Sequence, residues 1–289
     1  MRIIATSDLH YNVVRSRAPT EAIAREICRR GGDLLLLVGD SASTDLAVIE
    51  RLFGLFDSFS GERLAVAGNH ELWTPGGQDS LHRYENELSA ICARCGVHYL
   101  DAAPYRADGV AIVGSVGWYD YTFRPAALSI PLRFYQHKVA PGAAARIESL
   151  KHLLDPEDDV PRGTLDITTR WMDGERVHLP MSDIDFAQHT AARLRSHLEQ
   201  VEADADRIVA AVHHLPFAEL VPHSILPNWE FATAFLGSEL LGEALLDHLK
   251  VSHVFCGHSH RRRTCRKNHL VCTSIGSTYG KKQYETLDL

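Results

Sequence analysis

The chain has no apolar run that approaches the ~20 residues of a membrane-spanning helix. It also has no excess of positive charge, because 30 Lys and Arg stand against 37 Asp and Glu and give a formal net charge of -7. A chain of this charge is poorly suited to broad electrostatic binding of nucleic acid or of an anionic membrane. We therefore expect neither a nucleic acid nor a membrane as its partner.

The six cysteines have no arrangement that would hold a structural zinc ion or form a redox motif. One CxxC pair, Cys92 and Cys95, stands alone, whereas a zinc ribbon needs a second pair and a redox motif needs a thioredoxin-like context. We expect free, mostly buried thiols. The first residues show no signal-peptide pattern, because "RIIAT" is typical of a β-strand of the folded domain. The expected location is the cytoplasm.

Strand-like and helix-like segments alternate along most of the chain. Apolar patterns predict strands at 2–6, 33–40, 63–70, 97–101, 109–118, 207–214 and 253–260, with a closing strand and turn in 268–280. Helical spacing predicts helices at 20–30, 46–59, 80–96, 182–203 and 238–250. The run "DLLLLVGD" is typical of a strand covered on both faces. Repeated strand–helix–strand units imply an α/β sheet with helices on its faces, in a single domain over 1–289.

One segment, at about 118–185, lacks this alternation. It is rich in Pro, Arg, aromatic and acidic residues and has no clean period. Long connections of this kind are usually lids, binding loops or disorder. The aromatic content favours an ordered cover.

Metal-capable side chains follow the predicted strands at the point where each strand ends. The motifs are "SDLH" (Asp8, His10), "VGD" (Asp40), "AGNHE" (Asn69, His70, Glu71), "VHHLP" (His213, His214) and "CGHSH" (His258, His260). Each motif alone is an ordinary turn or cap signal, but together they indicate one site at the carboxyl edge of the sheet. Carboxylate, amide and imidazole groups suit Mn, Fe, Zn or a similar divalent ion. Glycines before Asp40, Asn69 and His258 permit tight turns that let the side chains converge.

The ordered motifs Asp-x-His, Gly-Asp, Gly-Asn-His-Glu, His-x-x-Pro and Gly-His-x-His resemble those of the calcineurin-like metallophosphoesterases. They run from residue 8 to residue 260, so the resemblance covers nearly the whole chain. It implies an α/β (α+β) fold, a four-layer αββα sandwich of two mixed sheets with a metal site at the strand ends. It also implies two divalent metal ions, one held by Asp8, His10 and His260, the other by Asn69, His213 and His258, with Asp40 bridging them.

The same resemblance implies catalytic roles for Asp40 and His70. His70 matches the histidine placed to touch the substrate phosphate, and His213 matches the ligand of its motif, with His214 in reserve. The implied reaction is hydrolysis of a small phosphorylated substrate, a phosphomonoester or a phosphodiester, by a hydroxide that bridges the metals. A non-catalytic binding or scaffold protein of the same fold, and a nuclease, are the alternatives. The motifs indicate no particular oligomeric state.

Several residues outside the motifs have two interpretations. The basic run "RRRTCRK", from Arg261 to Lys267, could steer an anionic substrate or form a solvated turn between two strands. The aromatic residues of the cover could form a stacking wall for a base or aryl group, or could pack that segment onto the sandwich; they are Trp118, Tyr119, Tyr121 and Trp171. Asn12 and Trp73, close to the ligand motifs, could also reach a substrate.

Overall fold

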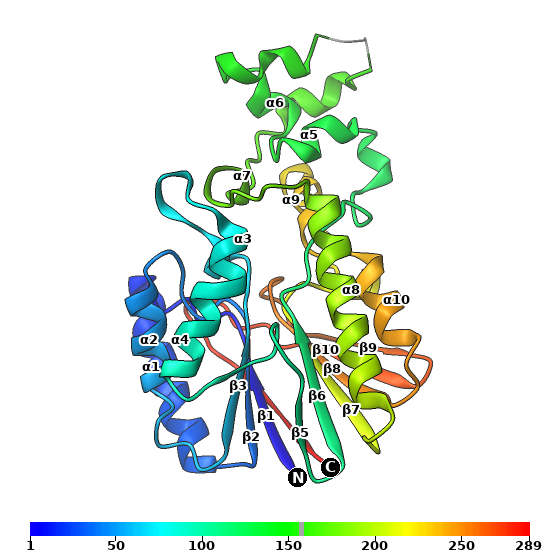
Figure 1. Cartoon of the computed structure of the whole chain (residues 1–289). Coiled ribbons are helices and arrows are strands. Elements are labelled where there is room, and N and C mark those ends of the chain that lie inside the picture. The colour runs from blue at the N-terminus through cyan, green and yellow to red at the C-terminus, as the bar shows by residue number, and fades with distance from the viewer. Residues whose placement is uncertain (156–158) are drawn as a thin grey trace.

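Two β-sheets face each other, with helices on both outer sides and a group of short helices over one end (Figure 1). The computed structural model describes residues 1–155 and 159–289. The two termini lie together at the opposite end, where the Met1 ammonium group donates a hydrogen bond of 2.8 Å to the Leu289 carbonyl.

The first sheet has five strands in the order β11-β1-β2-β3-β4. Their bounds are β1 Arg2–Thr6, β2 Leu34–Val38, β3 Glu62–Val66, β4 His98–Tyr99 and β11 Tyr284–Asp288. Strands β1 to β4 run parallel, and β11 runs antiparallel to β1. The outer face is covered by helices that connect the parallel strands, namely α1 Val14–Arg30, α2 Leu46–Gly54 and α4 Leu88–Arg94 (Figure 1).

The second sheet has six strands in the order β5-β6-β7-β8-β10-β9. Their bounds are β5 Tyr105–Ala107, β6 Val110–Ser115, β7 Arg207–Val212, β8 Val251–Cys256, β9 Arg263–Lys267 and β10 Leu270–Ser274. The central strands β6, β7, β8 and β10 are parallel, and both edge strands are antiparallel to their neighbours. Helices α8 Asp183–Glu202 and α10 Glu239–Leu246 cover the outer face (Figure 1).

Strand β2 shows how the sequence specifies these layers. Leu34, Leu36 and Val38 belong to the apolar cluster between the sheets, whereas Leu35 and Leu37 belong to the cluster beneath the outer helices. All five side chains are buried, as the apolar run predicts for a strand covered on both faces. The four-layer αββα sandwich of two mixed sheets is confirmed.

Two helices differ from their predicted bounds. Helix α1 begins at Val14 rather than at 20 and contains Pro19. Pro19 is the sixth residue of this helix, beyond the first N–H groups that lack an intrahelical acceptor, so the helix lacks one backbone hydrogen bond, to the Arg15 carbonyl, at this position. The helix predicted at 80–96 is a succession of α3 Ser80–His82, a π-helical turn at Arg83–Glu87, and α4.

The sequence patterns do not predict three short strands, and all three lie at sheet edges. They are β5, β9 and β11. The sequences "RTCRK" of β9 and "YETLD" of β11 are charged, as edge strands often are, and show no apolar run. The interpretation of 261–267 as a turn is therefore wrong for Arg263–Lys267, which pair with β10.

The segment 118–185 forms short helices over the carboxyl ends of the strands (Figure 1). The α-helices are α5 Leu132–Gln136, α6 Pro141–Ala144 and α7 Asp173–Arg176, and α9 Pro227–Ala232 lies beside them. Short 3₁₀ helices occur at Ala126–Leu128, Glu148–Leu153 and Arg162–Asp166. Residues 156–158 of this segment lie outside the described residues. In the described ranges, no helix is long and apolar enough to cross a bilayer.

Candidate metal centre

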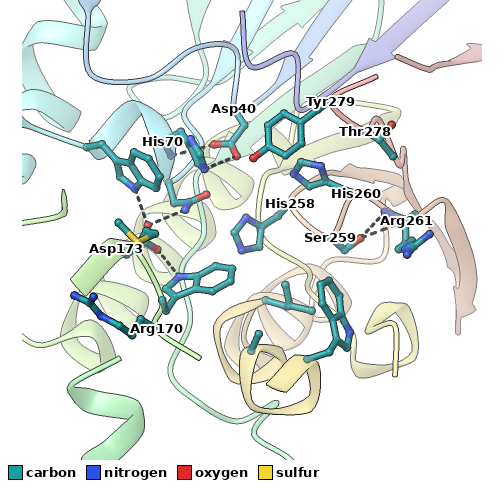
Figure 2. Close-up of a pocket in the computed structure, with 17 residues that line it drawn as sticks. Asp40, His70, Arg170, Asp173, His258, Ser259, His260, Arg261, Thr278 and Tyr279 are labelled. Carbon is teal, nitrogen blue, oxygen red and sulfur yellow. Dashed lines mark hydrogen bonds and ion pairs between the residues drawn. The ribbon is translucent and has the colours of Figure 1, made fainter. Parts of the chain in front are cut away.

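The predicted ligand residues gather where five strands end under the cover. In the first sheet, Asp8 and His10 follow β1, Asp40 follows β2, and Asn69 follows β3. In the second sheet, His213 follows β7, and His258 and His260 follow β8. A cavity there is bordered by Asp40, Asn69, His70, His258 and His260 (Figure 2). Asp8, His10 and His213 are fully buried.

The backbone at this site is left-handed at five of the predicted ligands. The φ angles are 54° at Asp8, 43° at His10, 52° at Asp40, 65° at His258 and 54° at His260. Such angles are uncommon for residues with a Cβ and cost on the order of 1–3 kcal/mol each. Backbone bonds hold them, such as that from the His10 N–H to the Asp40 carbonyl at 2.8 Å. Strain concentrated in this way is typical of a functional site.

Two glycines let the strand ends approach one another. A Cβ at Gly68 would lie 2.2 Å from Asp40 Oδ1, and a Cβ at Gly39 would lie 2.3 Å from His213 Nδ1. Gly39 also has a φ of 77°. Both positions therefore require glycine, as the sequence predicted for the turns before Asp40 and Asn69.

The first cluster consists of Asp8, His10, Asp40 and His260. One ligand atom from each lies within 4.8 Å of the others. His10 Nε2 is 3.3 Å from His260 Nε2 and 3.5 Å from Asp40 Oδ2, and His260 Nε2 is 3.6 Å from Asp8 Oδ1. Four atoms that could bind a metal ion thus lie close to one point.

The second cluster consists of Asp40, His213 and His258, again with ligand atoms within 4.8 Å of one another. His213 Nδ1 donates to the Val38 carbonyl at 3.0 Å, which turns Nε2 toward Asp40 Oδ1 at 3.4 Å. His258 Nε2 donates to the Phe235 carbonyl at 3.1 Å, which leaves Nδ1 as its acceptor. A backbone bond on one ring nitrogen is the usual means of fixing a metal-binding imidazole.

Asp40 belongs to both clusters. Its Oδ2 faces His10 in the first, and its Oδ1 faces His213 in the second. A carboxylate whose two oxygens face two separate clusters of potential metal ligands has the geometry of a bridging ligand.

The pKa shifts of the predicted ligands show that the site favours binding of a positive ion. Burial, with Glu71 and Asp8 nearby, raises the pKa of Asp40 well above its ordinary value. Burial and neighbouring imidazoles lower the pKa values of His10 and His258 well below the ordinary value. Burial likewise lowers the pKa of His213. The histidines are therefore neutral near pH 7, the form that binds a metal.

Four buried polar atoms at the centre have no hydrogen-bond partner within residues 1–155 and 159–289, namely Asn69 Oδ1, His213 Nε2, His10 Nδ1 and His70 Nδ1. His213 Nε2 is within ion-pair range of Asp40, but the contact lacks hydrogen-bond geometry. A buried acceptor without a partner costs about 1–3 kcal/mol. A divalent cation would satisfy Asn69 Oδ1 and His213 Nε2, so the residues present fit such a cation.

Asp173, in the cover, holds the Asn69 amide in this orientation. Its Oδ1 accepts from Asn69 Nδ2 at 2.9 Å and from Trp73 Nε1 at 2.7 Å. Its Oδ2 accepts from Trp171 Nε1 at 2.8 Å and from the Tyr119 hydroxyl at 3.1 Å. Because the amide nitrogen is bound to Asp173, the amide oxygen is left for the metal centre.

Glu71 stabilises the turns that follow β2 and β3 by hydrogen bonds to their backbone. Its carboxylate accepts from the backbone N–H groups of Asp40 at 2.9 Å, Ala42 at 2.8 Å and Gly68 at 2.7 Å. Burial raises its pKa while these bonds oppose the rise. Glu71 therefore links the ends of β2 and β3.

His70 stands at the border of the cavity. Its ring stacks on Trp73 at 3.8 Å between centroids, and its Nε2 is 3.9 Å from Asp40 Oδ2. Burial, with His213 and His260 nearby, lowers its pKa to about 3. A neutral imidazole there has one N–H to offer to a bound anion.

The structure separates the residues that the sequence left with two interpretations. Trp118, Tyr119 and Tyr121 are core residues, whereas Trp171 and Trp73 line the cavity. Of the basic run, Arg261 lines the cavity (Figure 2). Arg262 pairs with Glu285, and Lys267 pairs with Glu219. Asn12 does not line the cavity, and His214, though buried, is outside both clusters.

Several residues at the site were not predicted, among them Asp173, Trp229, Tyr279 and Lys282. Asp173 lies in the aperiodic cover, and Trp229 lies in a helix with no clear sequence pattern. Tyr279 packs against His10 at 4.8 Å and against His260 at 5.3 Å between ring centroids. Lys282 donates to the Asp8 carbonyl at 2.6 Å, and burial lowers its pKa to about 8.

The six cysteines are free thiols, as predicted, but only three of them are buried, whereas most were expected to be. None of the six belongs to either ligand cluster.

An αββα sandwich with a carboxylate and imidazole centre over its strand ends is the architecture of a metal-dependent phosphoesterase. The chain belongs to the calcineurin-like phosphoesterase family, whose sequence profile matches residues 1–262. The family resemblance drawn from the motifs is confirmed.

Several solved structures share this fold. The phosphopantetheinyl hydrolase of Mycobacterium tuberculosis is 20% identical, with a TM-score of 0.69 over 96% of this chain and 89% of that chain. A dimetal phosphatase from Danio rerio is 11% identical, with a TM-score of 0.55 over 99% of this chain and 91% of that chain. A protein of Thermus thermophilus is 12% identical, with a TM-score of 0.54 over 99% of this chain and 98% of that chain. A comparison with curated protein sequences gives no match.

Proposed function

We propose that the protein hydrolyses small phosphate esters with two divalent cations bound at this centre. Asp8, His10 and His260 would hold one cation, and Asn69, His213 and His258 the other, with Asp40 shared. The observation that carries the proposal is the position of Asp40, whose two oxygens face separate imidazole groups at 3.5 and 3.4 Å.

Divalent cations held here would lower the pKa of a water molecule and neutralise charge on the phosphoryl oxygens. The chain's own residues fix where this happens. Asp40 is locked by the His70 backbone N–H, which donates to its Oδ1 at 3.0 Å. The His70 side chain borders the cavity and would donate its N–H to a phosphoryl oxygen as charge grows there. Its low pKa favours this hydrogen-bonding role over delivery of a proton to the leaving group.

The first test is metal-dependent hydrolysis by Asp40→Ala and Asp8→Asn, with Glu199→Gln as an exposed carboxylate control. Aryl phosphomonoesters and diesters are assayed with Mn, Fe, Zn and Mg added separately. A phosphopantetheinyl ester joins the panel because the Mycobacterium structure carries that name. We expect both site variants to lose at least 100-fold in activity with unchanged circular dichroism. Wild-type turnover by either variant after metal reloading would refute the assignment.

The same measurements separate the alternatives. A scaffold protein would bind metal, by elemental analysis, and hydrolyse none of the esters. A nuclease would bind duplex DNA at low salt, with affinity that falls steeply as salt rises. A preference above about tenfold between matched esters, or about 1.4 kcal/mol of barrier, decides between monoester and diester chemistry.

A further inference from the structure

The cavity over the metal centre is much larger than a phosphate group requires. Its volume is about 520 Å³, within the range of pockets that bury a drug-sized ligand. One side carries the ligand residues and His70. Another part of the lining is a wall of apolar side chains, formed by Trp171, Met172, Trp229, Ala232 and Leu236.

Trp171 is fixed before any ligand arrives. Its Nε1 donates to Asp173, and its ring stacks on Phe235 at 5.1 Å between centroids with 10° between the planes. Its ring lies 5.7 Å from the ring of His258 between centroids, with 74° between the planes. The indole is therefore held rigidly beside the second ligand cluster.

Trp229 comes from a separate part of the chain, helix α9. Its Nε1 donates to the Pro222 carbonyl at 2.6 Å, which fixes the ring, yet 36% of the residue remains exposed. Met172 is also 38% exposed. Large apolar side chains that are exposed at a cavity rather than packed into a core mark a surface for binding apolar groups.

We propose that this wall is a subsite for a planar aromatic ring, up to the size of a purine, on the organic group of the substrate. The inference rests on the proposed function, because it places the phosphoryl group at the metal centre. Indole faces that are held by hydrogen bonds stack on flat rings at little cost in side-chain entropy. The substrate class is therefore a small aromatic phosphate ester, such as a nucleotide.

The test compares adenosine 5′-phosphate with ribose 5-phosphate, which share the reacting ester and differ by the base. If the ester screen shows a diesterase, the methyl esters of both are used. We expect the wild type to favour the adenosine ester in kcat/KM. Trp229→Ala should reduce that preference by roughly 5- to 150-fold, the effect of losing one stacked base, and Trp229→Phe should restore most of it. Leu249→Ala, which removes an exposed apolar side chain outside the cavity, serves as the control.

Binding without metal separates this inference from the proposed function. Adenosine should quench the tryptophan fluorescence of the metal-free protein, whereas ribose should not, and Trp229→Ala should weaken the adenosine response. No preference for the adenosine ester, or an equal loss on both esters in Trp229→Ala, would overturn the subsite. Absence of hydrolysis of every ester, with adenosine still bound at the wall, would refute the proposed function and leave the subsite standing.

Discussion

Replacing Asp173 with alanine tests whether the cover orients a metal ligand. The carboxylate is buried, lies 104 residues from Asn69 in the sequence and is bonded directly to its amide. Without it, no other hydrogen bond in the described residues holds the Asn69 amide in its orientation. Rotation of the amide would present an NH₂ group to the cation, which is repulsive.

The magnitude follows from what each of the four donors to Asp173 can do afterwards. Asn69, Trp73 and Trp171 border the cavity, where water can replace the carboxylate, but Tyr119 is fully buried and loses its partner. One orphaned buried donor costs about 1–3 kcal/mol of unfolding free energy. The metal effect is separate, because loss of a group that orients a ligand weakens metal affinity by about 10- to 100-fold.

Asp173→Asn is the discriminating variant. Its oxygen can still accept from Asn69 and Trp73, and its NH₂ group can donate to the Tyr119 hydroxyl, which rotates to accept. Only the Trp171 bond is then lost. We therefore expect Asn to preserve metal affinity within a few-fold and Ala to weaken it by the full factor.

Calorimetric titration of the metal-free protein with Mn²⁺ or Zn²⁺ measures both binding steps, and urea unfolding measures stability. Asp166→Ala, an exposed carboxylate of the same cover, is the control and should change neither. Wild-type affinity for both ions in Asp173→Ala would refute the positioning role. Equal weakening by Asn and Ala would show that the negative charge matters, and not the orientation of Asn69.

Two further predictions concern charge. In the metal-free protein, the His70 contribution to the unfolding free energy should fall as pH drops from about 6.5 toward about 3, by about 1.4 kcal/mol per pH unit, because the unfolded chain binds the proton that the folded imidazole does not. Buried carboxylates with raised pKa values, such as Asp40 and Asp101, act in the opposite direction, so the contribution is measured as the difference in unfolding free energy between the wild type and His70→Gln in urea titrations across this range; a difference that grows on acidification would contradict the prediction. Arg261→Gln should raise KM for an anionic ester roughly two- to fivefold at low salt, with the effect vanishing at high salt, whereas Arg266→Gln outside the cavity should not; a KM change that persists at high salt would exclude simple steering.

The sequence predicts the strands whose own residues form an apolar pattern, whichever strands they pair with. Strand β2 is buried on both faces, so its run of leucines identifies it without reference to its partners. Edge strands β9 and β11 exist only because a neighbour supplies hydrogen bonds, and their charged residues point to no structure by themselves. The start of α1 is also hard to predict from the sequence. Its first turns, which contain Pro19, are held by hydrogen bonds from the Ser16 and Thr20 hydroxyls to the carbonyls of Tyr279 and Leu9.

The ligand motifs were visible because each combines a strand, a tight turn and a metal-capable side chain within a few residues. Asp173 and Trp229 have no such local context. Asp173 follows an aperiodic stretch, and its partners come from the segment after β3, from the segment after β6 and from Trp171 in the cover. A carboxylate of that kind can be recognised only when all four donors are seen at once.

This difference follows from how the site is divided between two parts of the chain. The strand ends are constrained by left-handed backbone at five ligands and by glycines that tolerate no Cβ, so substitutions there would disturb the metal centre itself. The wall of the cavity comes mainly from the cover and from α9, which belong to neither sheet. Asp173 connects the two parts, because it holds Trp171 in the wall and Asn69 in the metal centre with one carboxylate. A change of substrate through the wall should therefore be tolerated as long as Asp173 keeps both bonds, and a wall variant that displaces Asp173 should lose metal as well as specificity.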